Sequence, residues 1–118
     1  MGKPLTTVAF TSGFLAQSKA EGMTEGEIDL LVQTLAANPK LGDMIRGSGG
    51  CRKVRVAGRG KGKSGGYRVV TFFAHPAMPI YLIAMLSKGA RENFNAAEVA
   101  AMAKATKAIL AQNPRATG

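Results

Sequence analysis

The sequence predicts an α+β fold, in which a small antiparallel β-sheet has helices packed on one face, in the order β-α-α-β-β-β-α. Three observations lead to this class. Short segments rich in β-branched and aromatic residues occur once near the start of the chain and three times from residue 51 onward. Segments with helix-cap signals and helical spacing of apolar residues lie before and after the three later strands. The length of 118 residues fits a single domain, residues 1–118, with its own core.

One strand and two helices are expected in the first part of the chain. Leu5–Phe10 is short, apolar and β-branched, which indicates a strand. Ser12–Ala20 is a weakly amphipathic helical segment. The next helix is predicted over Glu25–Ala37, because Thr24 and Glu27 form a capping box and apolar residues follow at helical spacing.

A glycine-rich connector, Leu41–Gly50, leads to the later elements, and the loop Gly58–Gly66 joins the first two of the strands there. The last of these strands is almost wholly apolar, which predicts that both of its faces are buried. The elements expected here are strands over Cys51–Ala57, Tyr67–Ala74 and Pro79–Ser87, a turn over His75–Pro79, and a helix capped by Asn95 that continues to about Ala111.

The positive charge is concentrated in the middle of the chain. The formal net charge is +9, and no acidic residue lies between Met44 and Ala90. That stretch carries nine cations: Arg46, Arg52, Lys53, Arg55, Arg59, Lys61, Lys63, Arg68 and Lys88. A segment of one sign attracts a polyanion. Nucleic acid is the first candidate, an acidic protein segment is the second, and an anionic membrane surface is a poor third.

Other classes of site are poorly supported by the composition. The single cysteine, Cys51, opens a strand and is expected to be a small core residue. The one histidine, His75, lies in a turn, so no zinc or other metal site is expected. The sequence suggests no signal peptide and no membrane span, and we expect a cytoplasmic protein with no cofactor and no membrane partner.

The loop "GRGKGKSGGYR" resembles two nucleotide-binding motifs. Gly60, Gly62 and Gly65 satisfy G-x-G-x-x-G, and a G-K-S end of a P-loop is also present. Both motifs need a helix directly after the glycines, whereas a strand follows here, which argues against a nucleotide cofactor. Three cations of the loop, Arg59, Lys61 and Lys63, remain candidates for contacts to nucleic-acid phosphate, and the alternative is a solvated hairpin.

Alternation along the first of these strands places Lys53 and Arg55 on the face opposite two valines. Cross-strand pairing can bring Arg68 to the same face. Lys88 is expected at the rim of the sheet. Tyr67, at the start of its strand, is expected to pack in the core or at the rim, with base stacking as the minority alternative. For the cations, including Arg52, the alternative is an ordinary solvated sheet face, although proteins usually intersperse charges of both signs.

The stretch from about Asn38 to Glu98 resembles the RelE superfamily of bacterial type II toxins, specifically its HigB-like branch. The resemblance rests on "GGCRKVR", on "GKGKSGGYRV" with the strand that follows, and on the late lysine before an N-cap. It implies the RelE-like fold and a ribosome-dependent mRNA endonuclease that acts in the ribosomal A site without metal. The ribose 2′-hydroxyl attacks the adjacent phosphorus. A cognate antitoxin, typically a helix-turn-helix DNA-binding protein, is the implied partner.

The resemblance also implies roles for individual residues. Lys53 is expected as the base and Arg55 as the phosphate stabiliser, with Arg68 as the phosphate-binding arginine and Lys88 near the leaving group. Arg52, Arg59, Lys61, Lys63 and Tyr67 are the expected RNA contacts. The chain departs from the family pattern at Ala90, where an acid is common, and it has no tyrosine after Tyr81. Two alternatives remain: a gyrase poison of the ParE type, and a non-catalytic basic module that binds an acidic antitoxin segment.

Overall fold

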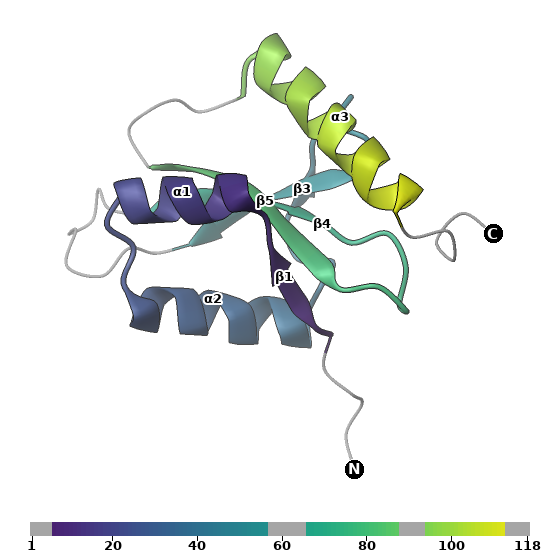
Figure 1. Cartoon of the computed structure of the whole chain (residues 1–118). Coiled ribbons are helices and arrows are strands. Elements are labelled where there is room, and N and C mark those ends of the chain that lie inside the picture. Colours follow the sequence, from purple (N-terminus) through teal and green to yellow (C-terminus); the bar gives the residue numbers. More distant parts are fainter. Residues whose placement is uncertain (1–5, 57–65, 88–93, 113–118) are drawn as a thin grey trace.

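The computed structural model describes residues 6–56, 66–87 and 94–112, which form one five-stranded sheet and three helices (Figure 1). The α+β class is confirmed, and so is the predicted order of elements. One short strand, β2, is an addition within the predicted connector. Along the chain the elements are β1 (Val8–Phe10), α1 (Ser12–Ala20), α2 (Glu25–Ala37), β2 (Asp43–Met44), β3 (Cys51–Val56), β4 (Tyr67–Phe72), β5 (Ile80–Ser87) and α3 (Ala96–Ala111).

The sheet is mixed rather than wholly antiparallel. Its strand order is β1-β5-β4-β3-β2. The pairs from β2 to β5 are antiparallel, as predicted, whereas β1 pairs with β5 in parallel. A parallel pair requires a long connection between its strands, and here α1, α2 and the antiparallel strands lie between β1 and β5.

Helices α1 and α2 cover one face of the sheet. The predicted capping box of α2 is confirmed, because the Glu27 backbone N–H donates to Thr24 Oγ1 at 3.1 Å and the Thr24 N–H donates to Glu27 Oε1 at 2.8 Å. Phe14, Leu31 and Leu35 from these helices are buried in one cluster with side chains of β3, β4 and β5. This layer forms the larger part of the hydrophobic core.

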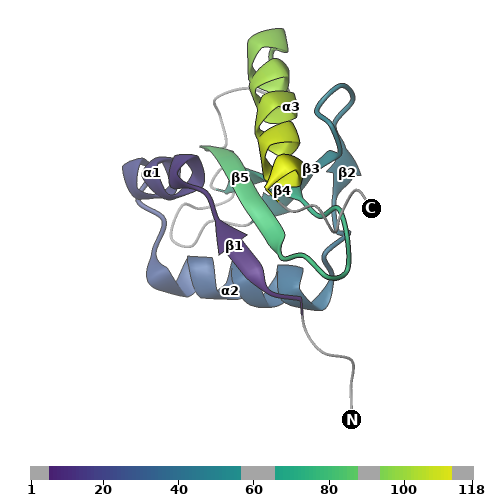
Figure 2. The same cartoon turned by 45° about the vertical axis from the view of Figure 1, so that its right-hand side comes forward.

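Helix α3 covers part of the opposite face, so the helices do not all pack on one face as the sequence suggested. Its Met102 is buried with Cys51, Val70 and Phe72, which alternate with the residues that face α1 and α2. Figures 1 and 2 show α2 and α3 on opposite sides of the sheet. The physical reason is that every residue of β4 is buried, and a strand with two apolar faces must be covered on both.

Candidate nucleic-acid interface

The antiparallel register of β3 and β4 brings three cations to one face of the sheet. Arg55 lies directly opposite Arg68, and Lys53 lies opposite Val70. Directly opposite residues share a face, so the register confirms the prediction that Arg68 lies on the same face as Lys53 and Arg55. We call Lys53, Arg55 and Arg68 the basic face.

The three cations of the basic face differ in exposure. Arg55 is exposed and Lys53 is half-buried, whereas Arg68 is only 6% exposed. The side chain of Arg55 is open to solvent, whereas the packing around Arg68 leaves little of its side chain in contact with solvent. The basic face therefore has one exposed and one largely buried arginine.

Two predicted RNA contacts lie away from the basic face. Arg52 points to the other face by strand alternation, and its Nη1 donates to the Gly42 carbonyl oxygen at 3.1 Å. Tyr67 is 4% exposed within the cluster under α1 and α2. Burial raises the pKa of its phenol, and the carboxylates of Glu27 and Glu21 raise it further. The structure thus places both side chains in packing positions.

Four further predicted site residues, Arg59, Lys61, Lys63 and Lys88, lie outside the described residues.

The predictions for the single cysteine and the single histidine concern residues that the structure describes. Cys51 is fully buried, as expected of a core residue, and this burial raises the pKa of its thiol to about 11, against a smaller lowering by the hydrogen bond with Ser48. His75 Nδ1 accepts a hydrogen bond from the Ala77 N–H at 2.9 Å, within its turn.

Sequence reasoning missed an acidic residue beside the basic face. Asp43 on β2 lies directly opposite Lys53 on β3. The sequence had suggested that no acid lay near this lysine, because the nearest one in the chain is ten residues away in a glycine-rich connector. A strand of two residues has no detectable periodicity, so only the pattern of glycines at 42, 47, 49 and 50 could have indicated a tight hairpin.

A small groove of about 260 Å³ lies beside Lys53. It is smaller than the pockets of roughly 300–1,000 Å³ that usually hold small-molecule ligands. Its polar members are Asp43, Arg46 and Lys53, and the segment that leads into α3 contributes Phe94. A groove with cations, a carboxylate and an aromatic ring suits part of a single-stranded nucleic acid.

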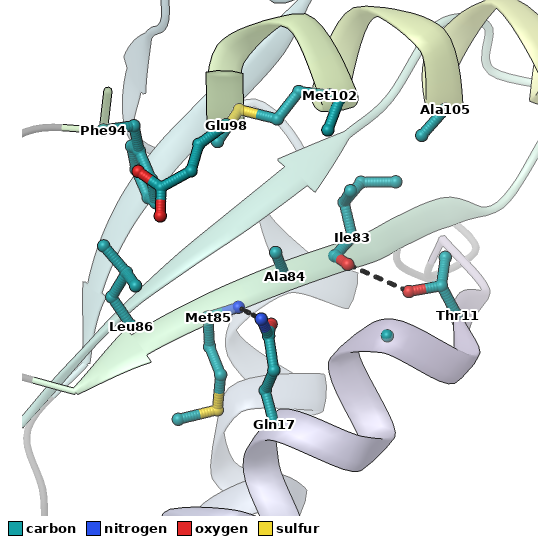
Figure 3. A pocket seen from close by; sticks show the side chains of 12 residues that line it. Thr11, Gln17, Ile83, Ala84, Met85, Leu86, Phe94, Glu98, Met102 and Ala105 are labelled. Atoms are coloured by element: carbon teal, nitrogen blue, oxygen red, sulfur yellow. Dashed lines mark hydrogen bonds between the residues drawn. The ribbon is translucent and has the colours of Figure 1, made fainter. Parts of the chain in front are cut away.

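A second groove, of about 360 Å³, runs over β5 between α1 and α3 (Figure 3). It is mainly apolar, and none of the described residues that line it is a lysine or an arginine. Thr11 Oγ1 donates to the Ile83 carbonyl oxygen at 3.0 Å, and the Met85 N–H donates to Gln17 Oε1 at 2.8 Å, so α1 is fastened to β5 along this groove.

The described residues contain neither a cluster that could bind a metal ion nor a helix that could span a membrane. Within residues 6–56, 66–87 and 94–112, no group of three or more histidine, cysteine, aspartate or glutamate residues could hold a metal ion. In the same residues, no helix has the length and apolar character needed to cross a bilayer.

Comparison with known proteins supports the family suggested by the sequence. The family model described as the RelE toxin of the RelE/RelB toxin–antitoxin system matches residues 27–116. The fold is similar to that of E. coli toxin RelE, solved as a double arginine-to-alanine variant in the free state, with a TM-score of 0.54 and 17% sequence identity. That match covers 86% of this chain and 97% of the other. The chain therefore belongs to the RelE toxin family of toxin–antitoxin systems.

Proposed function

We propose that this protein is a ribosome-dependent endoribonuclease that cuts mRNA and so stops translation. The ribose 2′-hydroxyl of the message is the nucleophile, and the reaction uses neither a metal ion nor a cofactor. The protein acts in the cytoplasm at the ribosomal A site. Membership of the RelE toxin family supports the class of function, and the basic face supports the chemistry.

The observation that carries the proposal is the pairing of Arg55 with Arg68 beside Lys53. Attack of the 2′-oxygen produces a pentavalent phosphorane with additional negative charge, and fixed cations stabilise such charge. Like charges directly opposite each other across two strands repel. An anionic phosphate between the two arginines attracts both of them and offsets this repulsion, so the basic face is suited to the negatively charged transition state.

The other predicted cations extend the proposal beyond the described residues. Lys88 is assigned near the leaving oxygen, and Arg59, Lys61 and Lys63 are assigned as contacts to the RNA backbone. Arg52 and Tyr67 are omitted from the RNA contacts, because one holds the Gly42 carbonyl and the other is buried on the opposite face.

The family implies an antitoxin partner, and we propose a small helix-turn-helix DNA-binding protein in this role. An antitoxin segment that is acidic would compete with RNA for the basic face. The same cations would serve a module that only binds such a segment, and the fold is also compatible with a gyrase poison, so the experiment must separate three outcomes.

The test is primer extension on cellular messages after induced expression of the wild type and of Arg55→Ala. The proposal predicts cuts at a fixed position within the reading frame for the wild type and their loss in the variant. Intact mRNA with broken DNA would identify a gyrase poison. Intact mRNA and intact DNA would identify a binding module.

A further inference from the structure

The β2–β3 hairpin brings a carboxylate to the edge of the basic face. Asp43 and Lys53 are directly opposite in the antiparallel register, so their side chains leave the sheet on the same side. Asp43 is exposed, so its carboxylate is open to solvent and to a ligand. Both residues line the same small groove.

The position of Asp43 is fixed by its neighbours in the hairpin. Gly42 has a φ of +99° and approaches β3 so closely that a Cβ there would lie 2.5 Å from the Lys53 carbonyl oxygen. The Gly42 carbonyl accepts the hydrogen bond from Arg52 described above. On the other side of β2, the Ile45 N–H donates to the Cys51 carbonyl oxygen at 2.8 Å. These contacts stabilise the register in which Asp43 lies opposite Lys53.

The hairpin turn adds to this rigidity. Ser48 Oγ donates to the Ile45 carbonyl oxygen at 2.6 Å and accepts from the Cys51 N–H at 2.9 Å, so one buried hydroxyl closes the turn. Thr106 Oγ1 of α3 donates to the Ser48 carbonyl oxygen at 3.4 Å. The strand that carries Asp43 is therefore joined both to β3 and to α3.

An aspartate is ordinarily ionised at neutral pH and a lysine is ordinarily protonated, so the first can accept a proton and the second can donate one. On the basis of the proposed function, we infer that Asp43 is the general base of RNA cleavage and that Lys53 is a proton donor. The carboxylate takes the proton of the 2′-hydroxyl as the bond between the 2′-oxygen and phosphorus forms. The bond from phosphorus to the 5′-oxygen breaks, and that oxygen takes a proton from the Lys53 ammonium.

The products of this step are a 2′,3′-cyclic phosphate and a 5′-hydroxyl, with a neutral lysine and a protonated aspartate that exchange protons with water. The assignment differs from the role of base that the family resemblance gave to Lys53. The inference follows from Asp43, which precedes the stretch from Met44 to Ala90 in the sequence but lies beside the basic face in the fold.

Among the described residues that line this groove, the charged groups other than Asp43 are basic. Arg46 and Lys53 share the groove with it, and Arg55 and Arg68 lie further along the same face. Among the described residues, the side of α3 contributes Phe94 and Val99 to the groove, and neither side chain titrates.

The first measurement is the single-turnover cleavage rate of the wild type on ribosomes programmed with a defined message, from pH 6 to pH 8. With a carboxylate base, the rate is flat in this range. With a lysine base, whose free pKa is about 10.4, the rate rises by roughly tenfold per pH unit. A rise of this kind would overturn the inference, and this result requires no variant.

The second measurement compares Asp43→Asn with Asp29→Asn, a matched change at an exposed aspartate on α2. Loss of a general base lowers the rate by about 10²- to 10⁴-fold. We expect this loss for Asp43→Asn, with unchanged ribosome binding and thermal stability, and no loss for Asp29→Asn. A loss of less than tenfold for Asp43→Asn overturns the inference while the endonuclease stands. A wild type that leaves the message intact overturns both.

Discussion

Replacement of Gly42 by alanine tests whether the backbone at this residue lies in close contact with β3. Two costs arise. A positive φ, +99° at this residue, costs an L-amino acid roughly 1–2 kcal/mol. The new Cβ would also lie 2.5 Å from the Lys53 carbonyl oxygen and 2.8 Å from Val54 Cγ2, and overpacking of this kind costs about 1–3 kcal/mol. The expected loss in the free energy of unfolding is therefore about 2–5 kcal/mol.

Gly22 provides a matched control for the first of these costs. Its φ is +75°, and a Cβ built there meets nothing within 4 Å. Gly22→Ala should lose only the conformational part, about 1–2 kcal/mol. The assay is urea unfolding of both variants and of the wild type, monitored by circular dichroism. An equal loss in the two variants would refute the reasoning, because it would show that no close contact exists at Gly42.

Three further predictions concern single side chains. Arg55→Ala should lower the cleavage rate on programmed ribosomes by about 10²- to 10³-fold. Because Arg55 is exposed, the free energy of unfolding should change by less than about 0.5 kcal/mol. A loss of stability large enough to account for the loss of activity would contradict the proposed role of Arg55 in stabilising the phosphate. Tyr67→Phe should leave the cleavage rate unchanged and the free energy of unfolding unchanged or higher. The reason is that the buried hydroxyl has no hydrogen-bond partner among the described residues. A clear drop in either quantity, in cleavage assays or urea unfolding, would show that the hydroxyl of Tyr67 has a polar role. The folded state raises the pKa of Cys51 from 9.0 to about 11, so its contribution to stability is complete below pH 9 and is lost as the pH rises toward 11, by about 2–3 kcal/mol in total. Urea unfolding from pH 8 to pH 11 should show this loss in the wild type and a smaller one in Cys51→Ala, and parallel curves would contradict it.

The sequence predicted the elements of the fold well because their signals are local. The capping box at Thr24 and Glu27 and the apolar spacing behind it are properties of one segment, and both are present in α2. The arrangement of layers was less well predicted. The almost wholly apolar run of β5 already implied cover on two faces, yet which helix lies on which face depends on contacts between distant segments.

In the candidate site, too, the features set by local sequence were predicted and those set by tertiary packing were not. Strand alternation correctly placed Lys53 and Arg55 together, and the register adds Arg68 to their face. The burial of Arg68 could not be predicted, because it depends on the three-dimensional packing around the basic face. Asp43 was missed for a related reason: its strand exists only because the glycine-rich hairpin folds back onto β3.

The central claim is that this RelE-family protein cuts mRNA on the ribosome through the 2′-hydroxyl of the message. Its most direct test is the chemistry of the new RNA ends, made by the purified protein on programmed ribosomes and compared with the same message without ribosomes. The account predicts cleavage only with ribosomes, leaving a 2′,3′-cyclic phosphate or 3′-phosphate and a 5′-hydroxyl. New 3′-hydroxyl and 5′-phosphate ends would contradict it, because water would then be the nucleophile.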